Sequence, residues 1–189
     1  MLTKSELLEP LARARTDEVV VTCMGITRPW GRISNHDLDF ASADSAMGHT
    51  ADLALGIALA QPERRVICLN GDGSMLMSLG TLVTIVEADA RNLVLFVLEN
   101  GTYEITGNQP VPGASDVDFP GLARAAGFPR VYDLALPRDF EAVLPNILHS
   151  EGPVFVGVRM ERGSEGPISR SDREEARYLQ TSLAEWSQT

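Results

Sequence analysis

Positive charge is scarce in this sequence. Its 189 residues include 16 Lys and Arg against 26 Asp and Glu, which gives a formal net charge of −10 at pH 7. Nucleic-acid phosphates and anionic lipid headgroups are neutralised by clustered Lys and Arg, and the sequence contains no such cluster. We therefore expect no nucleic-acid partner and no membrane partner.

Long apolar runs and cysteines are also few. The longest uninterrupted apolar run, residues 93–98, is far shorter than the ~20 residues that span a bilayer, and the first residues lack the apolar stretch of a signal peptide. Cys23 and Cys68 stand in apolar surroundings, which favours two buried thiols over a disulfide. These features predict a cytoplasmic protein, and the length suits a single domain over residues 1–189.

Short apolar runs alternate with helical patterns along the chain. This alternation is typical of βα units around a mostly parallel sheet covered on both faces, so we predict an α/β three-layer sandwich. Strands are expected at residues 19–23, 39–41, 66–70, 93–98, 130–133 and 154–158. Helices are expected at residues 5–15, 50–60, 75–88, 119–126, 137–149 and 171–186.

Two segments contain the proline and glycine residues of long loops. They are residues 26–37 and 101–118, and each follows the carboxyl end of an expected strand. Loops of this length are uncommon in a compact domain unless they carry function. Because open parallel sheets bind ligands at this edge, we expect a site between these loops.

Residues 71–74 have the sequence Gly-Asp-Gly-Ser and lie between an expected strand and an expected helix. Backbone N–H groups at a helix start favour anions, and glycines let a diphosphate approach closely. Asp72 would repel a diphosphate unless a divalent cation lay between them, so the motif indicates a phosphate bridged by magnesium. A plain tight turn is the alternative interpretation of these four residues.

Asn100 follows the next expected strand along the chain. Its distance from Asp72, 100 − 72 = 28 residues, suits one helix and one returning strand, which would bring two adjacent parallel strand ends together. Carboxylate and amide oxygens are hard ligands that suit magnesium. The two residues are therefore candidate ligands of one metal ion.

The Gly-Asp-Gly-Ser segment followed by Asn100 resembles the thiamine diphosphate motif of the thiamine-dependent enzyme superfamily. Residues 45–49, Ser-Ala-Met-Gly-His, are similar to the segment that precedes this motif in the family's diphosphate-binding domain. Residues 100–109 resemble the following loop in the sulfopyruvate and phosphonopyruvate decarboxylase branch. The resemblance covers residues 19–110 and implies the thiamine diphosphate-binding fold.

The same resemblance implies roles for individual residues. Magnesium would be held by Asp72, Asn100 and the backbone carbonyl of Thr102. The cofactor would contact Gly25, Ser45, Met47, Gly48, Gly71, Gly73, Ser74, Thr102 and Tyr103. Met47 would bend the cofactor, although a plain core methionine also fits, and a strand-end turn explains Gly25 nearly as well. His49 and Glu104 are candidate catalytic residues, with a capping or packing role equally open for His49.

The family also needs a pyrimidine-binding domain, whose glutamate activates the cofactor, and one α/β domain already accounts for this chain. The resemblance therefore implies a hetero-oligomer with an alpha-type partner subunit that supplies this glutamate. The implied reaction is decarboxylation of a small 2-oxo acid, in which the thiazolium ring accepts electrons as carbon dioxide leaves. A carboligase of the acetolactate synthase type and a non-catalytic cofactor-binding module stay open as alternatives. Glu99 stands where the family usually has Asp or Asn, so the substrate is left undefined.

Overall fold

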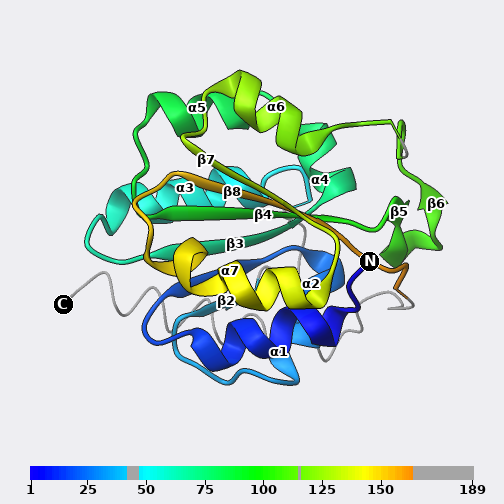
Figure 1. The fold of residues 1–189 in the computed structure, drawn as a ribbon, viewed down its shortest axis with the longest axis horizontal. Helices are drawn as coiled ribbons and strands as arrows, with labels where there is room; N and C mark the ends of the chain where they lie inside the picture. The colour runs from blue at the N-terminus through cyan, green and yellow to red at the C-terminus, as the bar shows by residue number, and fades with distance from the viewer. Residues whose placement is uncertain (42–46, 115, 164–189) are drawn as a thin grey trace.

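The computed structural model describes residues 1–41, 47–114 and 116–163, and a six-stranded sheet lies at its centre (Figure 1). Every neighbouring pair is parallel, in the order β2-β1-β3-β4-β8-β7. The strands are β1 (Val19–Thr22), β2 (Asp39–Ala41), β3 (Val66–Gly71), β4 (Leu93–Glu99), β7 (Arg130–Leu134) and β8 (Val154–Arg159). All six strands expected from the sequence are present, and their ends differ by at most one residue.

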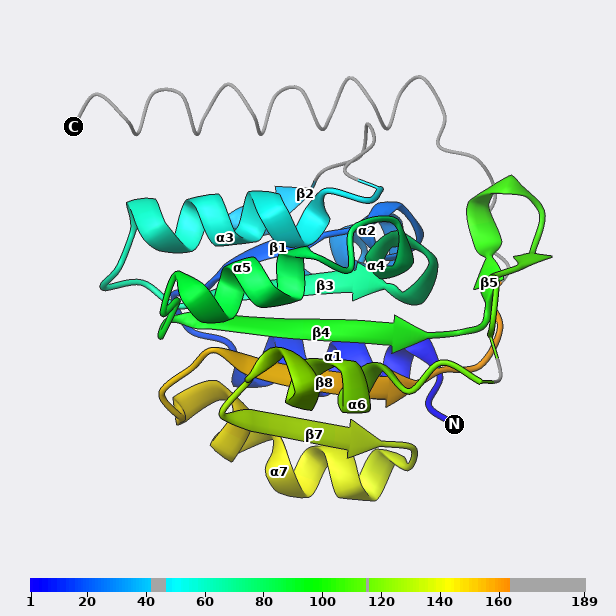
Figure 2. The same ribbon diagram turned by 90° about the horizontal axis from the view of Figure 1, so that it is seen from above.

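Helices cover both faces of the sheet. One face carries α1 (Lys4–Ala14), α2 (Met24–Gly31) and α7 (Pro137–His149), and the other carries α3 (Thr50–Ala60), α4 (Asp72–Met77), α5 (Thr81–Glu87) and α6 (Phe119–Ala126) (Figures 1 and 2). Each layer of helices packs on its own core cluster against the sheet. The predicted three-layer α/β sandwich is confirmed.

The central strands explain the apolar runs of the sequence. In β3, Ile67 and Leu69 enter the core beneath α1 and α7, while Val66 and Cys68 enter the core beneath α3. A parallel strand with both faces covered has no solvent side, so its sequence is apolar throughout rather than alternating. Cys68 is fully buried, and this burial raises the pKa of its thiol well above the ordinary value. Both cysteines are free and buried, as expected.

The helix predicted at residues 75–88 is wrong in its bounds, because the structure contains two helices there. The break spans residues 78–80, where serine and glycine have low helix propensity. The first helix, α4, already begins at Asp72, so the Gly-Asp-Gly-Ser motif lies at the helix start instead of in a turn before it.

The loop predicted at residues 26–37 is also wrong in part, because α2 occupies its first half. Ile26 and Trp30, one helical turn apart, are both buried in the core, and their burial stabilises the helix despite Pro29. Among its described residues, the second predicted loop, residues 101–118, contains only the short strands β5 (Thr102–Tyr103) and β6 (Gln109–Pro110) and one 3-10 turn, η1 (Glu104–Thr106). The helix predicted at residues 171–186 lies outside the described residues. Within the described ranges, no helix has the length and apolar character needed to cross a bilayer.

A buried polar network ties the edge strand β2 to two helices. The Asp39 carboxylate forms an ion pair with Arg15 and accepts hydrogen bonds from Trp30 Nε1 at 2.8 Å and from Ser34 Oγ at 2.6 Å. The Arg15 guanidinium also lies over the Trp30 ring, 5.8 Å from its centroid. Both charged side chains are almost fully buried, so each depends on the other for compensation of its charge.

We expect the substitution Asp39→Ala to lower the free energy of unfolding by about 3–5 kcal/mol, because it leaves Arg15 buried without its carboxylate. Urea denaturation measures this loss. The matched control Asp37→Ala removes an exposed carboxylate two residues earlier and should change stability by less than about 0.5 kcal/mol. Equal stability of the two variants would contradict this account of the network.

Candidate cofactor and metal site

A pocket lies at the carboxyl ends of β1, β3 and β4. It has about 600 Å³ of empty space, including the open solvent at its mouth. Strands β1 and β3 are neighbours, yet β1 continues into α2 on one face of the sheet and β3 into α4 on the other. Such a change of direction leaves a crevice between the two connections, which is where open parallel sheets bind ligands. The lining comes from residues 23–26, Met47, residues 71–74, Leu98, Asn100 and residues 102–106.

Asp72 links the ends of two strands. Its side chain is buried, and its two carboxylate oxygens accept the backbone N–H groups of Gly73 and Gly101, each at 2.7 Å. Burial raises the pKa of Asp72, while the two N–H groups act in the opposite direction. The backbone thus fixes this carboxylate at the pocket wall.

Asn100 and Asp72 follow the ends of two neighbouring strands, because β3 ends at Gly71, which pairs with Leu98 near the end of β4. Its Oδ1 accepts the backbone N–H of Thr102 at 3.0 Å, and its Nδ2 donates to Glu104 Oε2 at 3.3 Å. Asn100 and Thr102 both line the pocket, together with Asp72. The structure therefore brings the three candidate metal ligands to one cavity.

Two glycines allow close packing beside this site. A Cβ at Gly73 would lie only 2.5 Å from Tyr103 Cε1, so only glycine lets the Tyr103 ring lie against the start of α4. Gly48 has a φ of +85°, and its N–H donates to Ser74 Oγ at 2.9 Å. The segment around Gly48 is thereby fixed to the start of α4.

Most of the site residues expected from the sequence, including the candidate catalytic residue Glu104, line the pocket. These are Gly25, Met47, Gly71, Asp72, Gly73, Ser74, Asn100, Thr102, Tyr103 and Glu104. Gly48 is outside the lining and contacts Ser74 instead. His49 is also outside it: its side chain is 78% exposed and its Nδ1 lies 2.9 Å from Asp52 Oδ2. Ser45 lies outside the described residues.

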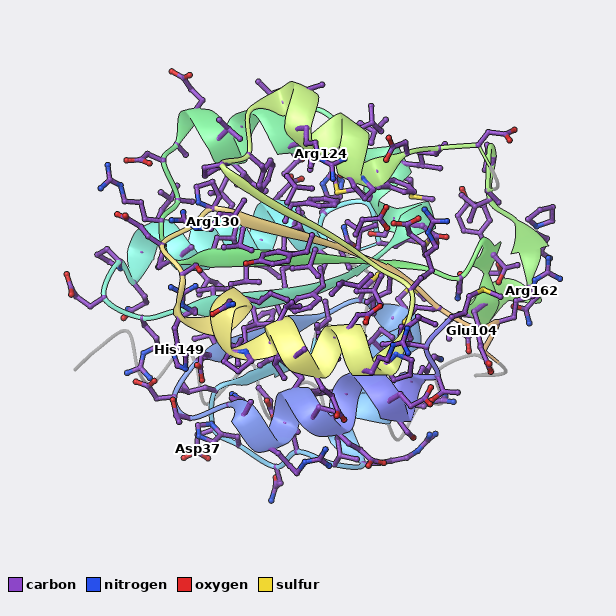
Figure 3. The ribbon with its side chains drawn as sticks, in the orientation of Figure 1. Asp37, Glu104, Arg124, Arg130, His149 and Arg162 are labelled. Carbon is purple, nitrogen blue, oxygen red and sulfur yellow. The ribbon has the colours of Figure 1, made fainter. Side chains whose placement is uncertain are left out.

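Sequence reasoning missed Lys4. Its Nζ donates to Glu104 Oε1 at 2.8 Å and to the Gly25 carbonyl at 3.0 Å, so the first helix reaches two residues of the pocket wall. Figure 3 labels Glu104 at one end of the sheet, and Figure 1 marks the N-terminus at the same end. Nothing local marks Lys4, because its partner stands 100 residues further along the chain.

The donors at the pocket favour a hard cation. No group of three or more His, Cys, Asp or Glu within the described part of the chain could hold a metal ion. The candidate set is instead mixed: the Asp72 carboxylate, the Asn100 amide oxygen and the Thr102 carbonyl. Oxygen donors of this kind suit Mg²⁺, which keeps several positions for water or for the phosphates of a ligand. The residues present therefore fit a magnesium-bound diphosphate.

Comparison with known families gives the class of the protein. Residues 23–158 match the family described as "Thiamine pyrophosphate enzyme, C-terminal TPP binding domain". The chain belongs to this family, and the resemblance inferred from the sequence is confirmed.

Individual relatives narrow the comparison. The chain is 36% identical over 177 residues to the sulfopyruvate decarboxylase subunit beta of Methanothermobacter thermautotrophicus, covering 93% of this chain and 91% of that one. It is 35% identical over 161 residues to the phosphonopyruvate decarboxylase of Streptomyces viridochromogenes, covering 85% of this chain but 40% of the relative. The fold matches a thiamine diphosphate-dependent 4-hydroxybenzoylformate decarboxylase from Rhodococcus jostii RHA1, with a TM-score of 0.72, 24% identity, and coverage of 87% of this chain and 33% of that one.

Among the acidic residues next to the site, Glu99 has the environment that is least favourable to a negative charge. Its Oε1 is buried and has no hydrogen-bond partner. Burial raises the pKa of Glu99 to about 7; Arg159 opposes this shift, and Asp133 adds to it. The pKa of a glutamate in an unfolded chain is about 4.3. The folded protein therefore binds this proton more tightly than the unfolded chain, so the contribution of Glu99 to stability falls as pH rises from about 4.3 to 7.

We expect Glu99→Gln to raise the free energy of unfolding of the metal-free protein at pH 8, and to have little effect near pH 4. The gain at pH 8 should be on the order of 1–2 kcal/mol, because solvent screening reduces the value that the full pKa shift gives. Urea denaturation at several pH values, with the exposed Glu87→Gln as control, measures the difference. A gain that does not change with pH would contradict this reading of Glu99.

Proposed function

We propose that this chain is the cofactor-binding, beta-type subunit of a thiamine diphosphate- and Mg²⁺-dependent decarboxylase that acts on a small 2-oxo acid such as sulfopyruvate or phosphonopyruvate. The observation that carries the proposal is the convergence of Asp72, Asn100 and Thr102 on one pocket in a chain of the thiamine pyrophosphate enzyme family. Alignment with 91% of a sulfopyruvate decarboxylase beta subunit supports the choice of branch.

In this proposal the chain binds and orients the diphosphate end of the cofactor. Asp72, Asn100 and the Thr102 carbonyl would hold Mg²⁺, and Gly71, Gly73, Ser74 and Tyr103 would surround the diphosphate. Two backbone N–H groups already orient the Asp72 carboxylate, so this side chain would lose little conformational freedom when the metal binds. Bound thiamine diphosphate supplies an electron sink for the carbon–carbon bond that breaks in decarboxylation.

The remaining candidates surround the other end of the cofactor. Met47 is partly buried at the pocket wall and would press an apolar side chain against the cofactor. Ser45 and Gly48 would border this end of the cofactor, whereas Gly25 would accompany the diphosphate. His49 is so exposed that a contact with substrate would require the partner's half of the pocket. Glu104 reaches the pocket as a candidate catalytic residue, but it is already paired with Lys4.

We further propose an alpha-type partner subunit that supplies the glutamate needed to activate the cofactor. The relative that this chain matches over nearly its whole length is named as a beta subunit. Among the described residues that line the pocket, Glu104 is the sole glutamate, and its carboxylate is bound by Lys4. A second chain would therefore complete the site. The alternatives are a carboligase with the same cofactor site, and a cofactor-binding module without activity.

Thiamine diphosphate and Mg²⁺ together should raise the melting temperature of the complex purified through a tag on this chain. We expect Asp72→Ala to abolish this rise, because the variant lacks the anionic metal ligand. Thermal unfolding with and without both ligands measures this rise. Chelation of Mg²⁺ should remove it from the wild type as well. Asp17→Ala, an exposed carboxylate outside the pocket lining, should respond like the wild type. A normal response from Asp72→Ala would overturn the proposed site.

A further inference from the structure

Three side chains connect the first helix to the candidate metal site. Lys4 Nζ lies 2.8 Å from Glu104 Oε1, and Glu104 Oε2 lies 3.3 Å from Asn100 Nδ2. The two charged side chains are shielded, at 18% exposure for Lys4 and 4% for Glu104. Water therefore screens this ion pair much less than it screens a surface pair.

Hydrogen-bond chemistry fixes which way the Asn100 amide faces. The backbone N–H of Thr102 can only donate, so the atom it contacts must be Oδ1. A carboxylate can only accept, so the atom facing Glu104 must be Nδ2. A flipped amide would place two donors together at Thr102 and two acceptors together at Glu104. Both contacts thus favour the same orientation, in which the amide oxygen and not the nitrogen lies beside Thr102.

Lys4 is itself held in place by the backbone. A capping box between Thr3 and Glu6 fixes the start of α1 at this residue. Just before it, Leu2 pairs with the chain after β8, donating to the Arg159 carbonyl at 2.8 Å. The amino end of α1 is therefore anchored at the carboxyl edge of the sheet, as Figures 1 and 2 show.

The second contact of Lys4 has a cause in the sequence of α2. Pro29 lies four residues after Gly25 in this helix and has no N–H to donate to the Gly25 carbonyl. Lys4 Nζ donates to that carbonyl instead, at 3.0 Å. The ammonium group thus joins two walls of the pocket, Gly25 from α2 and Glu104 from η1.

We propose that Lys4 and Glu104 are positioning residues that hold the Asn100 amide oxygen in the orientation that binds the metal ion. This inference rests on the proposed function and assigns Glu104 a role through Asn100 rather than in proton transfer. Outer partners that orient a ligand commonly change metal affinity by 10–100-fold when they are removed. A cation needs an oxygen from Asn100, so any loss of orientation should appear first in the affinity for Mg²⁺.

The test uses substitutions at both positions and a matched control. Glu104→Gln keeps the size of the side chain but can turn its own NH₂ group toward Asn100, so the orientation of the amide is no longer fixed. Lys4→Met keeps the apolar stem of the side chain and removes its positive charge, whereas Lys4→Arg keeps the positive charge. Arg13→Met removes a positive charge from the exposed end of the same helix and is the control.

Two readouts separate positioning from a general structural effect. The first is the Mg²⁺ concentration that gives half of the thermal shift caused by thiamine diphosphate in the tagged complex. The second is the NMR signal of the Asn100 side-chain NH₂ group in the isolated, metal-free chain, assigned by its loss in Asn100→Asp. The melting temperature without ligands shows whether each variant remains folded.

We expect Glu104→Gln to raise the half-saturating Mg²⁺ concentration by ~10-fold or more, and Lys4→Met to raise it in the same direction by a smaller factor. Both variants should shift the Asn100 signal, while Lys4→Arg and Arg13→Met should remain close to the wild type. Wild-type Mg²⁺ dependence and unchanged Asn100 signals in Lys4→Met and Glu104→Gln would overturn the inference alone. A wild-type complex that does not respond to thiamine diphosphate and Mg²⁺ would overturn the proposed function.

Discussion

The parallel pairing of β3 with β4 is the constraint on which the site depends. It brings the start of α4 beside the segment after β4, and the Gly101 N–H closes the gap by donating to Asp72 at 2.7 Å. One bond therefore joins the two halves of the candidate metal site, which stand 28 residues apart in the sequence. The apolar side chains of both strands are buried on both faces, so the register of this pair is set by the core and not by the site.

The two faces of the sheet contribute different parts of the pocket. Helix α4, from one face, supplies Asp72, Gly73 and Ser74, and α2, from the other face, supplies Gly25. Lys4 connects the α2 side to Glu104 at the third wall. The pocket is thus a junction of three chain segments, and two of them, α2 and α4, are anchored in a buried core. Such anchoring orients polar groups before a ligand arrives and reduces the entropy lost on binding.

Local patterns in the sequence predicted much of this structure. Apolar runs located all six strands of the sheet, because buried parallel strands leave an uninterrupted apolar signal. The spacing of Asp72 and Asn100 indicated two strand ends that meet, since a crossover of that length returns to the neighbouring strand. The resemblance to thiamine-dependent enzymes rested on short segments whose chemistry is specific, and family membership is now established. The roles of individual site residues stay predictions.

Other features depend on contacts that no local pattern encodes. Helix α2 forms across Pro29 because Ile26 and Trp30 are buried in the core, and Lys4 contacts Glu104 across 100 residues.

The central claim is that this chain is one half of a decarboxylase. The most direct test is to purify the complex from the native host and to add thiamine diphosphate and Mg²⁺. Carbon dioxide release is then measured with sulfopyruvate, phosphonopyruvate and pyruvate as substrates. The account predicts a second chain in the complex and release, with a free aldehyde as product, only when both chains are present. No release from a complex that binds the cofactor, release by this chain alone, or a coupled hydroxy ketone as product would contradict it.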